Sequence, residues 1–536
     1  MIELTFYGGI NEIGGNKVLL EDGSRALLLD FGFPYKTYKR FYEEYLRPRG
    51  GAGLLDPLTM NLLPPLDGLY RPDLASPDLW SRFRHSPAYR HAGDVQGVLL
   101  SHAHLDHSGH IAFLKHDIPV YATAMTAFIT KAMQDSGKSD FDQQVCYYTP
   151  TVYDRPTGWT QEAYLSDSSA PRRQRCFRLG DVSPDQLSAE AHQFWSSGFW
   201  QKTGRQKALD SCPLSTHHDC GFELRCFPVD HSIPGACAWA VNTSSGWVVY
   251  SGDLRLHGKR GALTERFIES AARLDPQVLI LEGTNVLRDT GVSEGDVFDN
   301  ALSAVASSNS LVIADFSARD IDRLLTFLDI ARQTNRKLAV LPRDAYLLRT
   351  LRLLDQQVPD VSEDENLVVY QETTASRSPA FWLRQVYDDY KSKTVLADDV
   401  HAAQDQFILC FSFFDLDELP SIRPAPGSLY VYSSSEPHDE EQEIDFRRLH
   451  AWLDHFGLKG FGVPFPSAEG WEVPQDQRGV HASGHAPGPD LLRIVQEVRP
   501  RKLIPIHTEH PEFYVESLRR SDIEVVLPAI GRAVQV

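Results

Sequence analysis

One short stretch constrains this chain more than any other, because it places four metal-ligand side chains within six residues. They are His102, His104, Asp106 and His107, and they follow an apolar run over 95–100 that predicts a buried strand. A turn directly after a strand can bring alternate side chains to one point, and zinc accepts imidazole and carboxylate ligands. We predict that the first two residues share one metal and that the last two serve a second. The alternative is that these residues are helix caps and surface histidines. It is disfavoured because four ligand-type residues at the end of a buried strand are too many to bury without a partner.

Two later strand ends offer the further ligands that a pair of metals needs. His231 follows a strand-like run that begins near 222, and Asp253 follows the run at 247–250. A carboxylate has two oxygens and can bridge two cations, so Asp253 is the candidate for the shared ligand. Taken alone, each residue reads as an ordinary structural side chain. Together with the first stretch, each is predicted to be a metal ligand.

The net charge of the chain bears on whether it can bind nucleic acid. The 536 residues hold 53 Lys and Arg against 72 Asp and Glu, a net charge of −19, so we expect a soluble acidic protein. This balance counts against nonspecific nucleic-acid binding but permits a local basic groove. Two basic clusters are present, and we expect them to form a solvated face rather than a substrate groove. The clusters are Arg172, Arg173, Arg175 and Arg178, and then Lys202, Arg205 and Lys207.

The seven cysteines are scattered and odd in number, which favours a reducing compartment. A possible zinc set at Cys212, His217, His218 and Cys220 matches no strong spacing template. The first residues run directly into strand-like sequence, without the pattern of a signal peptide. No apolar run reaches the roughly 18 residues that a membrane helix needs. The sequence therefore predicts a cytoplasmic protein that does not contact a membrane.

The chain divides into strand-rich and helix-rich parts. The strands predicted in the first part are 2–8, 16–21, 25–30, 95–100, 119–121, 238–241, 247–250 and 277–281. The stretches 33–94 and 138–218 have weak periodicity and read as insertions. From 296 to 465, strands alternate with helices of 10–15 residues, which is typical of a parallel α/β layer. The last part predicts two helices, near 489–498 and 511–519, on either side of a strand.

The candidate ligands, taken in order with Asp30, resemble the metallo-β-lactamase superfamily. This resemblance implies an α/β fold, the four-layered αββα sandwich of that superfamily. It also implies that Asp30 supports a metal ligand rather than binding metal itself, and that Asp253 bridges two metals. The superfamily contains many hydrolases, so the fold alone does not fix the substrate.

The C-terminal half resembles the beta-CASP nucleases of that superfamily. Residues 281–284 resemble their acidic first motif, 481–485 their second, and 505–507 their third. The layer at 296–465 lies where that family inserts its cap domain. We therefore expect three parts: a metallo-β-lactamase domain at 1–295, a beta-CASP cap at 296–465, and a return segment at 466–536 that completes the first domain.

Bacterial ribonuclease J is the member that the pattern resembles most. Residues 7–14 look like its glycine-rich N-terminal turn, and 433–435 resemble its serine-rich cap loop. A histidine in the third motif, here His507, is typical of RNA-acting members. The resemblance implies a ribonuclease with two divalent metals, zinc or else manganese, that activate a water to hydrolyse single-stranded RNA. Action from the 5′ end towards the 3′ end is also implied.

The resemblance assigns roles to individual residues. Asp106 is expected to act in the metal centre, and His485, oriented by Glu282, is expected to protonate the leaving 3′ oxygen. His507 is expected to complete the shell of the second metal or to contact phosphate. A further loop is expected to hold a phosphate through His481, Ser483 and Gly484.

Some positions depart from the ribonuclease J pattern. Thr508 stands where that family has Gly, and residues 410–415 and 435–439 lack the cap sequences expected. These departures leave open exonuclease or endonuclease action and a monomer or a homodimer. Three other functions stay in view: a DNA-acting beta-CASP nuclease, a hydrolase of small phosphodiesters or esters, and a non-catalytic binding protein. The complete ligand set argues against the last.

Overall fold

The computed structural model describes most of the 536 residues. The described ranges are 2–43, 45–137, 143–154, 163–167, 170–197, 209–216, 220–317, 319–373, 380–434, 440–467 and 470–536. The second basic cluster and His217 and His218 lie outside these ranges. None of the helices within them is long and apolar enough to cross a membrane.

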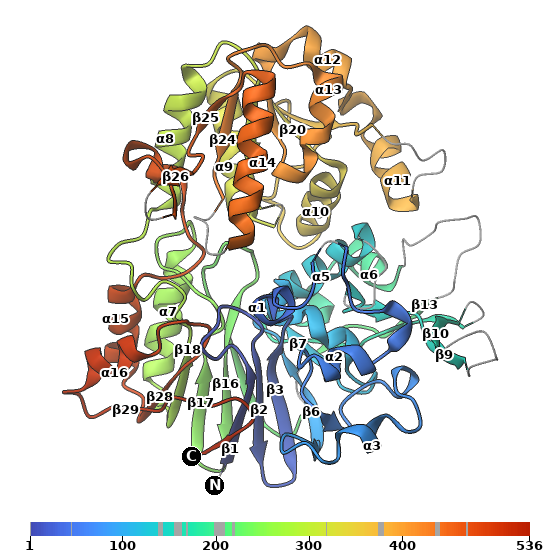
Figure 1. Cartoon of the computed structure of the whole chain (residues 1–536), viewed down its shortest axis with the longest axis vertical. Coiled ribbons are helices and arrows are strands. Elements are labelled where there is room, and N and C mark those ends of the chain that lie inside the picture. Colours follow the sequence, from blue (N-terminus) through green and yellow to red (C-terminus); the bar gives the residue numbers. More distant parts are fainter. Residues whose placement is uncertain are drawn as a thin grey trace.

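Two mixed sheets form the centre of the lower part of the molecule (Figure 1). The first has eight strands in the order β14 (Ser215–Thr216), β12 (Phe177–Leu179), β7 (Val120–Ala122), β6 (Asp94–Leu99), β3 (Arg25–Phe31), β2 (Lys17–Asp22), β1 (Ile2–Gly8) and β30 (Ala533–Gln535). The second has six strands in the order β15 (Glu223–Pro228), β16 (Cys237–Thr243), β17 (Gly246–Tyr250), β18 (Val278–Leu281), β28 (Lys502–Pro505) and β29 (Glu524–Val525). The pairing of β1 with β30 brings the two ends of the chain together.

The two sheets pack face to face because their strands alternate apolar side chains between two buried faces. In β3, Leu27 and Leu29 point into a core shared with Val248 and Tyr250 of the second sheet. Leu28 points to the opposite side of its sheet. Strand β3 is therefore buried on both faces, which explains the nearly continuous apolar run of its sequence.

Helices cover the outer faces, so the layers follow the order α, β, β, α. Helix α5 (Ala124–Ser136) and the pieces of the 33–94 stretch cover the first sheet. Helices α7 (Gly261–Ala272), α15 (Gly488–Val498) and α16 (Glu512–Leu518) cover the second. This confirms the predicted αββα sandwich of the metallo-β-lactamase fold.

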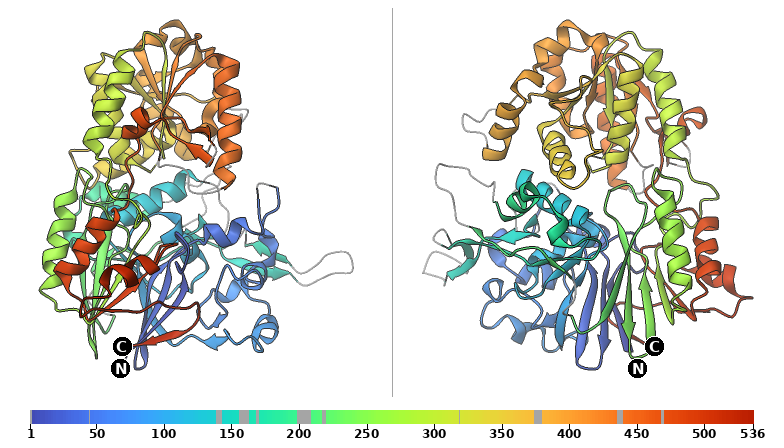
Figure 2. Two further views of the ribbon diagram at one scale, coloured as in Figure 1. Left: turned by 60° about the vertical axis from the view of Figure 1, so that its left-hand side comes forward. Right: turned by 180° about the vertical axis from the view of Figure 1, so that it is seen from behind.

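A second body, built on a parallel seven-stranded sheet, lies above this sandwich (Figures 1 and 2). Its strands run in the order β22 (Thr394–Val395), β21 (Leu367–Tyr370), β20 (Lys337–Val340), β23 (Phe407–Cys410), β19 (Val312–Asp315), β24 (Leu429–Tyr432) and β25 (Lys459–Phe461). One face carries α8 (Glu294–Ala306), α9 (Ile321–Gln333), α10 (Pro342–Arg352) and α11 (Phe381–Asp389). The other carries α12 (Ala397–Ala402), α13 (Leu419–Ile422) and α14 (Glu440–Phe456). This body is the inserted beta-CASP cap.

The remaining elements are short. In the 33–94 stretch they are α1 (Tyr35–Lys39), α2 (Leu55–Thr59), β4 (Leu66–Asp67), α3 (Leu79–Phe83) and β5 (Arg90–His91). In the 138–218 stretch they are β8 (Tyr147–Tyr148), β9 (Thr151–Asp154), β10 (Ala163–Ser166), β11 (Arg172–Gln174), α6 (Ala189–Ser196) and β13 (Leu209–Asp210). Helix α4 (Leu105–Ser108) follows the histidine stretch, and β26 (Phe465–Ser467) pairs with β27 (Gly470–Glu472) on the way back from the cap.

The structure differs from the sequence analysis in the 138–218 stretch. This stretch is not wholly an insertion, because β12 and β14 extend the eight-stranded sheet. They have three and two residues, too few for an alternating pattern to be recognised. Cys176 and Cys212 form a disulfide there, which the scattered cysteine pattern did not predict. Because Cys212 is bonded to Cys176, it is not free to join the zinc set considered with Cys220.

Candidate metal centre

All of the predicted metal ligands lie at one edge of the sandwich, directly after strand ends. The histidine stretch follows β6, His231 follows β15, Asp253 follows β17, and His507 follows β28. Strands β17, β18 and β28 are parallel neighbours, so their carboxyl ends meet at the same edge of the second sheet. The cap lies over this edge (Figure 1).

Three histidines form the first ligand group. His104 Nδ1 lies 3.0 Å from His102 Nε2 and 3.2 Å from His231 Nε2. Four tetrahedral ligands at about 2.0–2.1 Å from a zinc ion are about 3.3 Å apart. Both distances from His104 Nδ1 are close to this spacing, and all three nitrogens lie within 4.8 Å of one another.

The second group consists of Asp106, His107, Asp253 and His507. His107 Nε2 is 3.0 Å from Asp253 Oδ2, and His507 Nε2 is 3.3 Å from Asp106 Oδ2. The same Asp253 Oδ2 lies 3.6 Å from His102 Nε2, in the first group. One carboxylate oxygen thus faces both groups, which is the position that a bridging ligand requires.

Asp30 holds His107 in the orientation that a metal ligand needs. Its carboxylate accepts a 2.6 Å hydrogen bond from His107 Nδ1, which leaves Nε2 facing Asp106 and Asp253. Ser101 and Tyr250 fix Asp30 in turn, through bonds of 2.7 Å from Ser101 Oγ and 2.6 Å from Tyr250 Oη. Such carboxylate–histidine pairs are common behind metal ligands. Asp30 thus orients the His107 ring, and its role behind a metal ligand stays a prediction.

Two other ligands are oriented by segments that are distant in the sequence. His231 Nδ1 donates to the carbonyl of Gly484 at 2.6 Å, so its Nε2 is left to face the first group. His507 has a left-handed backbone, with φ of 55°, and its amide donates to the carbonyl of Gly9. The Thr284 hydroxyl lies 2.8 Å from His507 Nδ1. Contacts with distant segments therefore place both rings.

The electrostatics of the two groups differ. Burial, followed by the neighbouring histidines, lowers the pKa of His231, and burial lowers the pKa of His104 to about 4. Both rings are therefore neutral, the form that binds metal. Burial also lowers the pKa of His107, but Asp253, Asp106 and Asp30 outweigh it and raise that pKa well above its ordinary value.

These observations show that the residues fit two divalent cations. The carboxylates of Asp30, Asp106 and Asp253 surround His107, so the second ligand group favours a positive charge between its ligands. Asp253 Oδ1 is buried and makes no hydrogen bond in the described part of the chain. Neutral imidazoles and carboxylates together form a donor set that suits zinc. A metal in the second group would take the place of the proton that the carboxylates favour on His107.

His485 and Glu282 form a pair beside the second group. The buried Glu282 carboxylate accepts from His485 Nδ1 at 2.9 Å and from the amide of Leu254 at 2.9 Å. Burial lowers the pKa of His485, but Glu282 and Asp253 outweigh it and raise that pKa to about 9. The His485 ring lies 5.5 Å from the ring of His507. The pair thus presents a proton-bearing imidazole to the metal centre.

The structure supports only part of the predicted phosphate loop. The His481 ring is buried, with Nδ1 2.6 Å from the carbonyl of Ser434 and Nε2 2.9 Å from that of Gly462. Because both nitrogens face carbonyl groups, this ring fastens the loop to the cap and is not aimed at the metal centre. Ser483 Oγ accepts from Asn285 Nδ2 at 2.8 Å and from the amide of His485, which leaves its own proton to donate.

The first basic cluster is not a groove beside the metals. Arg175 is fully buried and donates to the carbonyls of Ala112, Leu114 and Lys115. Arg173 is exposed and lines a separate cavity of about 420 Å³. Arg175 is therefore a structural residue and not part of a solvated face. Arg173 is exposed to solvent, as expected for the cluster.

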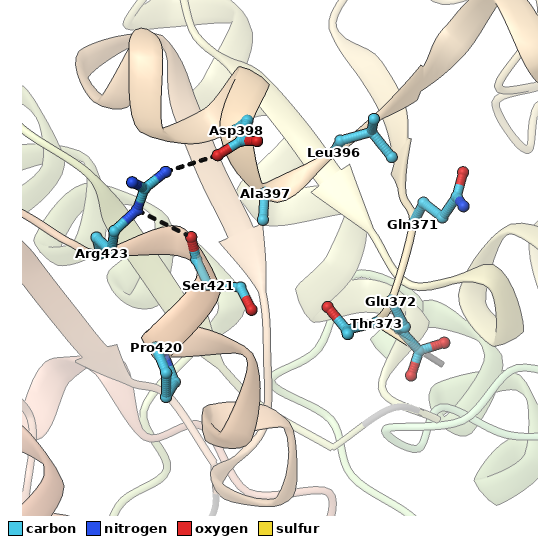
Figure 3. A pocket seen from close by; sticks show the side chains of 9 residues that line it. All are labelled: Gln371, Glu372, Thr373, Leu396, Ala397, Asp398, Pro420, Ser421 and Arg423. Carbon is cyan, nitrogen blue, oxygen red and sulfur yellow. Dashed lines mark hydrogen bonds and ion pairs between the residues drawn. The ribbon is translucent and has the colours of Figure 1, made fainter. Parts of the chain in front are cut away.

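A larger cavity, of about 640 Å³, lies within the cap (Figure 3). Arg423 is one of its lining residues and donates to Asp398 at 2.6 Å and to the carbonyl of Ser421 at 3.3 Å. No predicted site residue lines this cavity. The candidate site is thus the metal centre and not this cavity.

Sequence reasoning missed several residues that build the site. Ser101 directly precedes the histidine stretch, and this position is the sequence signal that could have indicated its contact with Asp30. Tyr250, Thr284 and Asn285 contact predicted residues from other strand ends. No sequence pattern identifies such contacts, because each depends on strands that pair only in the folded chain.

Comparisons with known proteins agree with this geometry. A family model described as "Zn-dependent metallo-hydrolase RNA specificity domain" matches residues 477–528. Ribonuclease J of Mycobacterium tuberculosis strain H37Rv is 22% identical over 517 residues, which cover 94% of this chain and 68% of that protein. Ribonuclease J of Mycolicibacterium smegmatis is 22% identical over 537 residues, with the same coverage of 94% and 68%.

A solved structure shares the architecture. The crystal structure of a protein of unknown function from Enterococcus faecalis V583 matches with a TM-score of 0.64 and 20% identity, over 99% of both chains. The chain is thus similar to ribonuclease J over most of its length, and its fold is a metallo-β-lactamase sandwich with a beta-CASP cap that places two ligand groups at one edge.

Proposed function

We propose that this protein is a metal-dependent ribonuclease that hydrolyses phosphodiester bonds of single-stranded RNA, from the 5′ end towards the 3′ end. One observation carries the proposal: Asp253 Oδ2 faces both ligand groups, and the His485–Glu282 pair lies beside them. The match of residues 477–528 to an RNA specificity domain supports RNA over DNA or a small ester. Cytoplasmic location and a homodimer stay predictions, as do the domain boundaries at 295 and 465.

The residues divide the chemistry between them. When bound, two zinc ions lower the pKa of a water and stabilise charge on the phosphate. His102, His104 and His231 would hold one ion, and Asp106, His107 and His507 the other, with Asp253 shared. Glu282 keeps the proton of His485 Nδ1, so the other ring nitrogen is left to protonate the leaving 3′ oxygen. Ser483 can donate its hydroxyl proton to a phosphate oxygen.

The test uses the purified protein with its metal content measured. It is incubated with end-labelled RNA and DNA of one sequence, each carrying a 5′-monophosphate or a 5′-hydroxyl. We expect metal-dependent loss of RNA, faster for the monophosphate, with mononucleotides as the first product. Equal cleavage of DNA would contradict RNA specificity. No cleavage of either polymer, with two metals bound, would favour a hydrolase of small substrates.

Replacing His485 tests the proton donor. We expect His485→Ala to lower kcat by a factor of about 100, the usual contribution of a general acid, with Kd for RNA little changed. The measurement is steady-state cleavage of a 5′-monophosphorylated RNA together with its binding. His510→Ala is the control, because that side chain is 46% exposed and pairs with Glu512. A change in RNA affinity alone would show that His485 is not the donor.

A further inference from the structure

The 35–43 segment, which contains α1, has an unusual composition for this acidic chain. Seven of its nine residues are aromatic or basic: Tyr35, Lys36, Tyr38, Lys39, Arg40, Phe41 and Tyr42. No residue of α1 is buried. Among the described residues, four of the twelve exposed large apolar side chains fall between 35 and 46. Apolar side chains that are exposed singly need no explanation, whereas a cluster of them often marks a binding surface.

This segment is fixed to the turn that carries the metal ligands. The amide of Phe33 donates to the carbonyl of Leu105 at 2.8 Å. A Cβ atom at Gly32 would lie 1.6 Å from the carbonyl oxygen of Asp106, so only glycine permits this approach. The chain therefore enters the 35–43 segment from a point in contact with the second ligand group. Figures 1 and 2 show α1 at the level where the cap faces the sandwich.

Two further contacts place α1 at the rim of the metal centre. Lys36 Nζ lies 2.5 Å from the carboxylate of Glu509, two residues after His507. Burial lowers the pKa of Arg319, and the charges of Tyr35 and Asp106 oppose this effect. Arg319 belongs to the cap and also donates to the carbonyl of Ala103. The cap thus contacts the histidine stretch through Arg319, and α1 contacts the segment after His507 through Lys36.

The aromatic side chains pack on one another but leave part of their surface exposed. Tyr38 packs on Phe33 and on Tyr42, with ring centres 4.9 Å and 5.1 Å apart, and Tyr35 packs edge-on against Phe33 at 5.0 Å. Tyr35 and Phe41 are each 40% exposed. The guanidinium of Arg40, also exposed, lies 5.5 Å from the Phe41 ring centre. The packed rings hold the segment in shape, and the exposed surfaces of Tyr35 and Phe41 lie beside cations.

We propose that the 35–43 segment binds single-stranded RNA next to the metal centre, with bases stacked on Tyr35 and Phe41 and phosphates held by Lys39 and Arg40. Stacking faces alternating with cations are the general means of binding a single strand without sequence preference. The segment carries three cations and one acid, Glu43, in a chain with a net charge of −19. This inference rests on the proposed ribonuclease function, and it concerns nucleotides beyond the scissile bond.

The experiment compares two RNA lengths on the metal-loaded full-length protein. Two double variants are made, Tyr35→Ala with Phe41→Ala, and Lys39→Gln with Arg40→Gln. The matched control combines Phe414→Ala with Arg448→Gln, whose side chains are exposed on the cap. Because the segment contacts distant nucleotides, we expect kcat/KM for a 20-nucleotide RNA to fall about tenfold in each double variant. The kcat/KM for a trinucleotide is expected to stay within twofold of the wild-type value.

Binding provides a second measurement that does not depend on cleavage. Anisotropy of the labelled 20-mer is recorded with the metals chelated, at several salt concentrations. We expect the Lys39 and Arg40 variant to reduce the slope of log Kd against log salt by about 1.4, or about 0.7 for each lost phosphate contact. This variant leaves the ring packing intact and remains informative if the aromatic variant does not fold.

The outcomes separate this inference from the proposed function. A wild-type protein that cleaves both RNA lengths, with both double variants unchanged, would overturn the inference alone. Equal losses on both lengths would also overturn it, because they would indicate damage to the metal centre. Unchanged RNA binding with a changed oligomeric state would show that the segment binds a second copy of the chain. A wild-type protein that neither binds nor cleaves RNA would overturn both proposals.

Discussion

His107→Ala is expected to abolish RNA hydrolysis in a protein that still folds. His107 Nε2 faces Asp253 and Asp106, while Nδ1 is held by Asp30. Removing the imidazole leaves His507 as the remaining nitrogen ligand of the second group and takes from Asp30 its histidine partner. Since two metals stabilise both the attacking and the leaving oxygen, we expect kcat to fall by at least about 10³-fold.

Metal content is the measurement that distinguishes this loss from unfolding. We expect the metal-to-chain ratio to fall from about two to about one, because the three histidines of the first group remain. His510→Ala is again the control, since its ring is exposed. Circular dichroism checks the fold. Retained hydrolysis, or an unchanged ratio with activity lost, would contradict the assignment of His107 as a metal ligand.

Most of the fold could be predicted because local sequence patterns indicate its strands and helices. Apolar runs such as 25–30 and 247–250 are buried on both faces in a sandwich, and they match β3 and β17 to within a residue or two. Alternating strands and helices likewise predicted the cap. The short edge strands β12 and β14 and the Cys176–Cys212 disulfide were missed. Their partners are distant in sequence, so no local pattern reports them.

The candidate site divides in the same way. The histidine stretch was recognisable because four ligand types occur within six residues, and the structure brings His231, Asp253 and His507 to it. Their roles as ligands stay predictions. The motif predicts a phosphate contact for His481, and in the structure its two ring nitrogens lie next to the carbonyl groups of residues 434 and 462. Residues that support the site through buried charges left no sequence signal.

The clearest example is a buried ion network between the sandwich and the cap. Arg323 of α9 is fully buried and lies 3.3 Å from each oxygen of Glu294. Arg255, after β17, also contacts Glu294, at 3.1 Å, and donates to the carbonyl of Ser483. Arg323 donates to the carbonyls of Val480 and Ala482. The two arginines therefore hold the loop that leads to His485.

Arg323→Met is expected to destabilise the protein by about 3–5 kcal/mol, the usual cost of removing one partner of a buried ion pair. Burial raises the pKa of Glu294, but Arg323 and Arg255 hold it below its ordinary value. The Glu294 contribution is therefore present at neutral pH and lost as the pH falls below about 4.5. Denaturant unfolding followed by tryptophan fluorescence measures the change.

The matched control for this variant is Arg273→Met. That side chain is 77% exposed and pairs with Glu269 at 3.5 Å, so we expect a loss below about 1 kcal/mol. Arg323→Lys should fall between the two, because an ammonium group cannot reproduce the planar contacts of the guanidinium. If the network also positions the 480–485 loop, kcat falls in Arg323→Lys even where the protein remains folded. Equal stability of the Arg323 and Arg273 variants would show that the network does not join the cap to the sandwich.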